Sequence, residues 1–384
     1  PMRALLIVLA SLGVGHMAAL PSAPGSDTLA RLFRETPGLQ LPHLFSLGLG
    51  EILHGRVFDP PARKCAASYG RMIQRSAGAD SLSALWELAG VVSGCPFAAA
   101  EQLSPENVAS LTGDGGEFLP QQAAPGEGAR ELASEHLRTG KPILTLGPGS
   151  ALHLSAHASV VTPARLGHFC RGLRRQADRW RIARVTGRLM EGVLGAWTPV
   201  GDPLCCPIVP PRTILNAISE RGFAVETVGG IHEAFARSGV TRAYNVPSPG
   251  GMPGLVDHLW AVPQNGVIFA RLESHGLDGL AQTLPIFDEW LGCFLEKLDS
   301  DNLLLIAGTN GGGPGTDDRQ EVPILAAYGG RAAPLGLRDT LGDVAATLAA
   351  FFGIAENGSP WSKHEPLLTF HRPRGHNGPW GKGS

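Results

Sequence analysis

Charged residues are scarce in this chain: Asp, Glu, Lys and Arg make up 17% of its 384 residues, where globular proteins average about 25%. The formal net charge is −2, so neither sign dominates. Nucleic acids and anionic membranes attract proteins through an excess of Lys and Arg, and we therefore expect neither as a partner. The densest basic run, Arg171 to Arg184, has a spacing that suits a solvated helix face.

Paired cysteine motifs are missing as well. The six cysteines, at positions 65, 95, 170, 205, 206 and 293, include no CxxC pair and no spacing typical of a metal site. Cys205 and Cys206 are adjacent, which favours neither an ordinary disulfide nor a shared metal ion. This usage is typical of reducing compartments, and we expect a cytoplasmic protein.

Long apolar runs are confined to the N-terminus, where ALLIVLASLGVG follows Met2 and Arg3. Such a run is compatible with the apolar part of a secretory signal peptide. It also suits a central parallel strand, which is buried on both faces and therefore apolar throughout. We favour a strand over Ala4–Leu9. No other run is long and apolar enough to span a bilayer.

The rest of the chain is divided by its composition into two units. Residues 98–128 are rich in Gly, Pro and Ala and lack periodicity, which indicates a linker into a second unit. Beyond residue 213, helical and strand patterns alternate, which is typical of a doubly wound parallel sheet whose ligands lie beyond the carboxyl ends of its strands. We expect a core domain at 1–97 and 213–370, an inserted α/β cap domain at 98–212, and a tail at 371–384.

Individual elements follow from periodicity and from capping residues. Ser26 and Asp27 are both suited to cap a helix that runs to Glu35. Asp80 is suited to cap a helix from Ser81 to Leu88. Backbone N–H groups near Ser81 should then point at whatever binds there. The stretch 199–211, PVGDPLCCPIVPP, is interpreted as an irregular return to the core domain. The other predicted helices are 130–137, 213–220, 231–238, 254–259, 280–298 and 341–352, and the other predicted strands are 142–146, 224–228, 266–272, 302–307 and 322–327.

Several stretches resemble the phosphopentomutase family in order and spacing across nearly the whole chain. They are GSDTLARLF (25–33), GLQLPHLFSLGLGEI (38–52), SYGRMIQRSAGADSLSALWELAG (68–90), GEGARELASEHLRTGKPILTLGPGSALHLSAH (126–157), DNLLLIAGTNG (301–311) and PGTDDRQEVPILAAYG (314–329). The resemblance implies an alkaline-phosphatase-like α/β core sheet with helices on both faces and a smaller inserted cap. It also implies a phosphorylated threonine between two manganese ions, which moves phosphate between the 1- and 5-positions of ribose.

The positions that the resemblance assigns to metal ligands have changed in this chain. The Asp that ends the first strand is Ala10, and an Asp-His pair is Thr309-Asn310. The His of a GTDH segment is Asp318, and another Asp aligns with Gly276. Two-metal sites need several oxygen and imidazole ligands that converge on both ions. One carboxylate at Asp318, even with a shifted His275 or Asp278, is too few. We therefore expect no bound metal and no other cofactor.

Substrate-binding positions of the family have changed too. The sugar-binding Asp of the cap aligns with Gly149, and an Arg expected to meet phosphate aligns with Trp197. An indole in place of a guanidinium removes a bidentate phosphate partner and supplies an apolar surface. We therefore expect Trp197 to bind substrate and the pocket to be less suited to anions.

Several side chains remain as candidates for chemistry. Ser81 replaces the nucleophilic threonine and is either a nucleophile or only a residue of the helix start. His275 with Asp278 is either a general base or a surface pair, and His16 should face the same cleft. Hydrogen-bond donors to the substrate are predicted at three positions: Ser11, Thr309 and Asn310.

His153 and His157 are spaced four residues apart and are predicted to lie on one face of a helix. That spacing is acceptable for zinc ligands, although a lone pair of this kind more often packs or caps.

Three functional hypotheses follow. The first is a metal-independent enzyme that performs isomerisation, cyclisation, elimination or hydrolysis on a small organic molecule, with a composition typical of high-GC bacteria and their specialised metabolism. The second is an inactive pseudoenzyme that binds a partner or forms a scaffold, which a filled site without a pocket would favour. The third is a phosphopentomutase with a rearranged metal site. The Pro/Gly/His-rich tail at 371–384 is a weak indication of a homo-oligomer.

Overall fold

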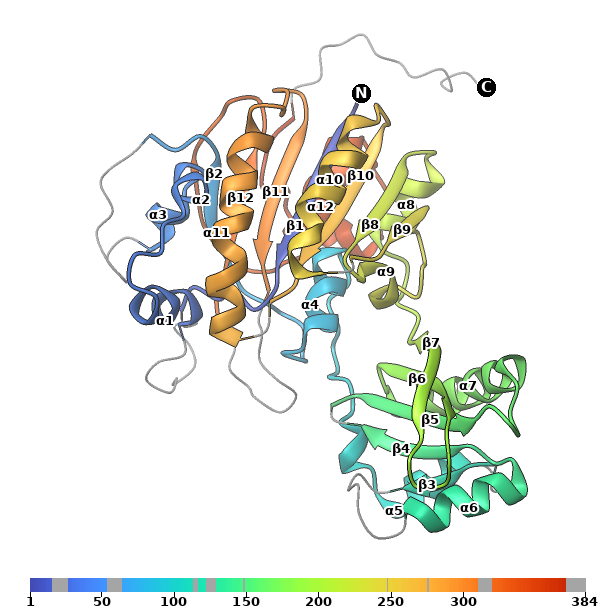
Figure 1. Ribbon diagram of the computed structural model, residues 1–384. Helices are drawn as coiled ribbons and strands as arrows, with labels where there is room; N and C mark the ends of the chain where they lie inside the picture. The colour runs from blue at the N-terminus through green and yellow to red at the C-terminus, as the bar shows by residue number, and fades with distance from the viewer. Residues whose placement is uncertain are drawn as a thin grey trace, which may run out of the picture.

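The computed structural model describes residues 1–15, 27–53, 64–112, 117–121, 129–147, 149–246, 248–274, 276–309 and 320–370. His16, His275, Asn310, Asp318 and the tail at 371–384 lie outside the described residues. The described part forms two lobes, each built on its own sheet, with the larger lobe above the smaller one in Figure 1. None of its helices is long and apolar enough to cross a membrane.

The larger sheet contains eight of the described strands, in the order β13-β2-β12-β11-β1-β10-β8-β9. Its neighbours are parallel except at β12, which runs antiparallel to both β11 and β2. The expected parallel sheet is therefore present with one reversed strand. The strands are β1 (Arg3–Leu9), β2 (Ser68–Met72), β8 (Ala224–Val228), β9 (Arg242–Tyr244), β10 (Gly266–Leu272), β11 (Leu303–Gly308), β12 (Val322–Ala327) and β13 (Pro334–Arg338).

Helices cover both faces of this sheet (Figure 1). One face carries α4 (Ser81–Leu88), α8 (Ile214–Glu220), α9 (Ile231–Ala234) and α12 (Asp343–Phe352). The other carries α1 (Thr28–Glu35), α2 (Pro42–Ser46), α3 (Leu49–Leu53), α10 (Met252–Ala261) and α11 (Gly276–Leu295).

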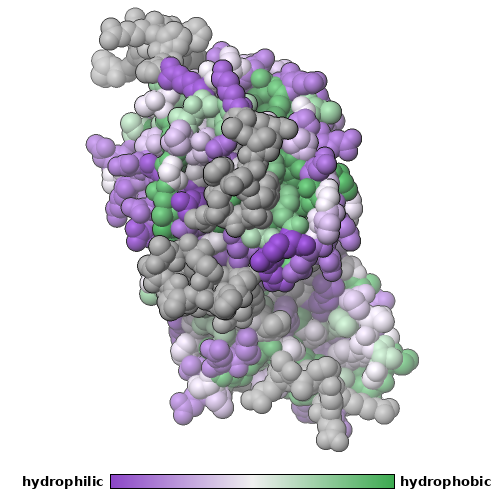
Figure 2. Space-filling view, turned by 90° about the vertical axis from the view of Figure 1, so that its left-hand side faces the viewer, coloured by the Kyte–Doolittle hydropathy of each residue, from purple (hydrophilic) through white to green (hydrophobic). Residues whose placement is uncertain are grey.

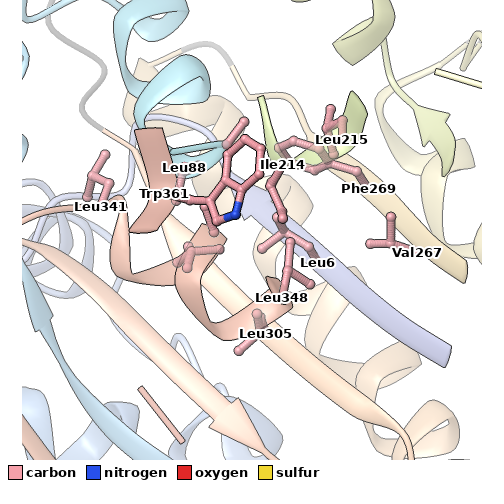
Figure 3. Packing of buried hydrophobic residues seen from close by; sticks show 14 of the residues in the cluster. Leu6, Leu88, Ile214, Leu215, Val267, Phe269, Leu305, Leu341, Leu348 and Trp361 are labelled. Atoms are coloured by element: carbon pink, nitrogen blue, oxygen red, sulfur yellow. The ribbon is translucent and has the colours of Figure 1, made fainter. Parts of the chain in front are cut away.

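β1 explains why the two faces form separate cores. Successive side chains of a strand point to opposite faces, so Leu6 joins the cluster under α12 while Leu5 joins the cluster under α11. Every residue of β1 is buried, which confirms the predicted central strand. Figure 3 shows the first cluster, where Trp361 lies with Leu88 and Ile214.

The smaller lobe is a sheet of five described strands in the order β3-β4-β5-β6-β7. Its apolar face packs against α5 and α7 through a cluster of its own. The strands are β3 (Leu119–Gln121), β4 (Ile143–Gly147), β5 (Ala151–His157), β6 (Arg184–Glu191) and β7 (Thr198–Pro207), and the helices are α5 (Pro105–Thr112), α6 (Ala129–Thr139) and α7 (Pro163–Ala177).

Two interpretations of this lobe are wrong. Residues 199–207 are not irregular, because they form most of the edge strand β7. His153 and His157 belong to strand β5 and not to a helix. Residues four apart in a strand are separated by about 13 Å along its axis, too far to bind one zinc ion at about 2 Å each.

Candidate functional site

The carboxyl ends of β1, β10 and β11 lie side by side, since Leu9 pairs with Leu272 and with Gly308. The next residues tie the ends together. The Ala10 N–H donates to the Leu272 carbonyl at 3.1 Å, and the Thr309 N–H donates to the Leu9 carbonyl at 3.2 Å. This is the edge where a doubly wound sheet is expected to bind its ligand.

Ser11 turns the chain away from this edge. Its φ of 64° lies in the left-handed region, which costs a non-glycine residue about 1 kcal/mol. The turn brings the chain close to β11, because a Cβ on Gly308 would lie 2.4 Å from the Leu12 carbonyl oxygen. Ala10 and Thr309 are consequently buried, with 5% and 2% of their surfaces exposed.

The described residues at this edge do not fit the two manganese ions that the family resemblance implies. The Ala10 methyl group has no atom that can bind a metal ion, and the Thr309 hydroxyl is a poorer metal ligand than a carboxylate. Asp80, the nearest carboxylate in sequence to Ser81, accepts hydrogen bonds from Ser83 N and Ser83 Oγ, both at 2.8 Å. Across the described part of the chain, no group of three or more His, Cys, Asp and Glu residues could hold a metal ion.

Helix α4 begins as the sequence predicts. Asp80 is its N-cap, and Ser81 is the exposed first residue. Backbone N–H groups at such a start carry a partial positive charge and favour an anion.

A buried carboxylate behind α4 holds the loop that leads into it. Glu87 is fully buried and accepts hydrogen bonds from the N–H groups of Arg75 and Ser76, the Ser76 hydroxyl, the Thr340 hydroxyl and the Leu341 N–H, over 2.7–3.0 Å. These donors come from the loops before α4 and before α12. Glu87 therefore fixes the approach to Ser81 without needing a cation.

A cleft between the two lobes opens beside α4. It consists of two adjoining cavities of about 510 and 420 Å³, which share Arg184, Gly230, Glu233 and Arg271. Ser81 and Asp80 line the larger cavity, together with Gly149 and Ser150 of the smaller lobe. Asn245, Ser248 and Glu273 line the other.

Two arginines from different lobes face this cleft. Arg184 is the first residue of β6, and Arg271 lies one residue before the end of β10. The Arg271 guanidinium pairs with Glu273 at 3.1 Å. The pKa of His153 in the smaller sheet is lowered below its usual value, mainly because the ring is buried. The positive charge of Arg184 lowers it further. The described lining of the two cavities therefore holds two guanidinium groups and three carboxylates, those of Asp80, Glu233 and Glu273. The expectation of a cleft less suited to anions stays a prediction.

The predicted site residues are only partly brought together. Ser81 lines the cleft. Ser11 and Thr309 lie at the strand ends, outside both cavity linings, and Asp278 is exposed in the first turn of α11.

Trp197 is not at the cleft. It lies between β6 and β7 at the end of the smaller sheet remote from Arg184, and its ring packs 5.6 Å from that of His136 and 5.2 Å from that of His157. Trp197 lies outside the linings of both cavities, and its role in binding substrate stays a prediction. The interpretation of the basic run as one helix face missed Arg184, which lies beyond the end of α7.

The smaller lobe is anchored beside the cleft by Arg181. Its guanidinium donates to Ser93 Oγ at 2.8 Å and to the carbonyl oxygens of Cys95 at 3.0 Å and Pro96 at 3.4 Å. It also lies 5.2 Å from the ring centre of Phe97. These contacts join residues 93–97, which follow α4, to the segment just before β6.

Comparison with known proteins identifies relatives over nearly the full length. No protein-family model matches the chain. A phosphopentomutase of Syntrophotalea carbinolica is 35% identical over 377 residues, covering 92% of this chain and 95% of the relative. Phosphopentomutases of Acetivibrio thermocellus and Methylobacterium radiotolerans are 32% and 34% identical, covering 92% and 93% of this chain and 97% and 98% of theirs.

The solved structures that match the chain are much more distant. The cofactor-independent phosphoglycerate mutase of Thermoplasma acidophilum is 12% identical with a TM-score of 0.34, covering 85% of this chain and 89% of its own. The PsFucS1 sulfatase from Pseudoalteromonas is 13% identical with a TM-score of 0.33, covering 93% and 69%. At 32–35% identity over more than nine tenths of both chains, the sequence relatives show that the chain belongs to the phosphopentomutase family.

Proposed function

We propose that this family member is a metal-independent enzyme that acts on a small organic anion in the cleft between its lobes. The observation that carries the proposal is the contrast between two neighbouring places. The strand ends present the Ala10 methyl and a buried Thr309, whereas the cleft keeps Ser81, Arg184 and Arg271. The cleft thus offers groups that bind an anion, whereas Ala10 and Thr309 at the strand ends offer poor metal ligands.

The anion would be held by two guanidinium groups and by the start of α4. Arginine suits phosphate and carboxylate because its N–H groups form paired hydrogen bonds. The helix start adds about 0.3–1 kcal/mol for a negative charge. Because Arg184 and Arg271 come from different lobes, an anion between them would also draw the lobes together.

Proton transfer is the chemistry that the described side chains of the cleft can support. Glu233 lines both cavities and is the carboxylate best placed to take a proton from a bound molecule. Ser81 can donate a hydrogen bond to developing negative charge at the helix start. Isomerisation, cyclisation, elimination and hydrolysis all fit this combination. The roles predicted for His275, Asp278 and His16 remain predictions.

The first test measures metal content and anion binding on the same sample. Protein from manganese- and zinc-supplemented medium is gel-filtered, analysed for metals and titrated calorimetrically with inorganic phosphate. We expect less than about a tenth of an equivalent of any divalent ion, because tight sites hold metal stoichiometrically. Phosphate should bind, and Arg184→Met should weaken it about tenfold or more. One or two retained equivalents of metal would overturn the proposal.

A phosphopentomutase with a rearranged metal site is the second candidate, favoured by 32–35% identity to proteins of that name. Conversion of ribose 1-phosphate to ribose 5-phosphate with added manganese would support it. The pseudoenzyme hypothesis needs a site without a pocket, and the cleft of about 510 and 420 Å³ argues against that condition.

A further inference from the structure

The two cavities of the cleft differ in the chemistry of their walls. The cavity of about 420 Å³ is lined by Arg271, Glu273, Asn245 and Ser248, so it is polar. The cavity of about 510 Å³ extends past Ser81 and is lined mainly by apolar side chains: Leu82, Leu85, Phe97, Ala151, Ala183 and Ala234. A ligand that spans both would meet charge at one end and hydrocarbon at the other.

The apolar wall is held in place by contacts outside the cavity. Trp86 packs edge-on against Phe97, with ring centres 5.3 Å apart, and donates its indole N–H to the Ala234 carbonyl at 2.7 Å. Arg181 lies over the same Phe97 ring. The wall is therefore formed before a ligand arrives, which avoids the entropy cost of ordering it on binding.

Small side chains keep this cavity open. Ala77, Gly78, Ala79, Ala99 and Gly149 all contribute to its lining. A volume of about 510 Å³ lies within the range of pockets for molecules of drug-like size, roughly 300–1,000 Å³. Such a space leaves room beside a bound anion. Apart from the two arginines, its hydrogen-bonding side chains are Asp80, Ser81, Ser150 and Glu233.

We infer that the substrate is an amphiphilic small molecule, with an anionic group at Arg184 and Arg271 and an aromatic or branched hydrocarbon body against Leu82 and Phe97. This inference rests on the anion site of the proposed function and adds a requirement for an apolar body. Apolar surface removed from water contributes about 25 cal/mol per Å², so the body should add affinity that a sugar cannot.

The test compares phenyl phosphate with ribose 5-phosphate and inorganic phosphate by calorimetry on the full chain. Phenyl phosphate should bind at least about tenfold more tightly than ribose 5-phosphate. Ala99→Leu, which narrows the apolar cavity with a larger side chain, should remove this advantage while inorganic phosphate binds as before. Ala332→Leu, at an exposed position, is the matched control and should change nothing.

The two proposals fail separately in this experiment. Equal or weaker binding of phenyl phosphate would overturn the inference, even where Arg184→Met weakens inorganic phosphate and the anion site stands. An advantage insensitive to Ala99→Leu would also overturn it, because the ring would then bind elsewhere. A third outcome is that phenyl phosphate binds more tightly to the parent protein but not to Ala99→Leu, while Arg184→Met leaves phosphate binding unchanged. The apolar cavity would then be supported, and the anion site would be overturned.

Discussion

The Glu87 carboxylate accepts hydrogen bonds from both the N–H and the hydroxyl of Ser76, each at 2.7 Å. The same hydroxyl accepts a hydrogen bond from the Ser93 N–H at 3.1 Å. Ser93 in turn accepts one from Arg181 of the smaller lobe. A continuous series of hydrogen bonds therefore runs from the core behind α4 to the other lobe.

Replacement of Glu87 tests the start of this series. Glu87→Ala should lower the free energy of unfolding by roughly 3 kcal/mol or more, because it leaves several buried donors without an acceptor. Urea denaturation followed by tryptophan fluorescence measures the change. Glu106→Ala, at an exposed position on α5, should cost less than about 0.5 kcal/mol. A loss below about 1 kcal/mol for Glu87→Ala would show that water or neighbouring groups replace the carboxylate.

Arg181→Asn tests the anchor between the lobes. Asparagine tolerates the left-handed backbone that Arg181 adopts at φ 51°, so the change removes the guanidinium with little added strain. Limited proteolysis should then cut at residues 93–97 several times faster, while urea denaturation of the larger lobe changes little. Arg179→Asn, an exposed neighbour, should behave like the parent protein. An unchanged cleavage rate in Arg181→Asn would contradict the anchoring role.

His136 should make the smaller lobe sensitive to acid. It is fully buried: Nδ1 lies 2.7 Å from the Lys141 carbonyl, and Nε2 accepts the His157 N–H at 2.8 Å. Burial lowers its pKa below the usual value, so the unfolded chain binds the proton more tightly than the folded protein does. Its contribution to stability is present above pH about 6.5 and is lost as the pH falls below that value.

Unfolding measured between pH 5 and pH 8 tests this dependence. His136→Gln should be less stable at pH 7.5, yet lose less further stability on acidification than the parent protein. His168→Gln, at an exposed position, should keep the parental pH dependence. Parallel curves for the parent and His136→Gln would assign the acid sensitivity to other groups.

Cys206 should be the thiol whose alkylation begins near neutral pH. A hydrogen bond with Cys170 lowers the pKa of Cys206 to about 7 against the opposing effect of burial, with further help from Arg171 and Arg174. The pKa of the buried Cys170 is raised by the same hydrogen bond and by burial. Iodoacetamide labelling followed by mass spectrometry should show Cys206 reacting with a midpoint near pH 7 and Cys170 remaining unlabelled.

The Cys170→Ala variant supplies the control for this thiol pair. Without its donor, Cys206 should react with a midpoint closer to the ordinary cysteine value of about 8.5. Labelling of the exposed Cys293 should be the same in both proteins. An unchanged midpoint for Cys206 would assign the low pKa to the arginines alone.

The sequence was most informative where a local rule decides the structure. The Asp80 cap, the start of α4 and the buried β1 were all predicted, because capping and continuous burial leave a local pattern. β5 also has a local pattern, since its residues alternate between buried and partly exposed. Histidines four apart suit a period of two as well as a helical period, so the helical interpretation of His153 and His157 overlooked that alternation.

Other features depend on contacts that no local pattern records. β7 contains Pro199, Pro203 and Pro207, which argue against a strand unless it lies at an edge of the sheet, as it does here. Arg184 and Arg271 come from separate lobes and meet at one cleft only after both lobes have folded. Their shared role could not be predicted from a basic run that resembled an ordinary helix face.

The position of β1 between β10 and β11 has a consequence for biosynthesis. Arg3 pairs with Gly266, and Leu9 pairs with Gly308. At about 5–20 residues per second, a ribosome needs roughly 15 to 60 s to complete the partners of this strand. The contiguous strands β3 to β7 can assemble during that interval, whereas the fully buried β1 has no neighbouring strand to pair with. Until residue 308 has emerged, the nascent protein therefore depends on chaperones or on transient collapse to keep β1 from aggregating.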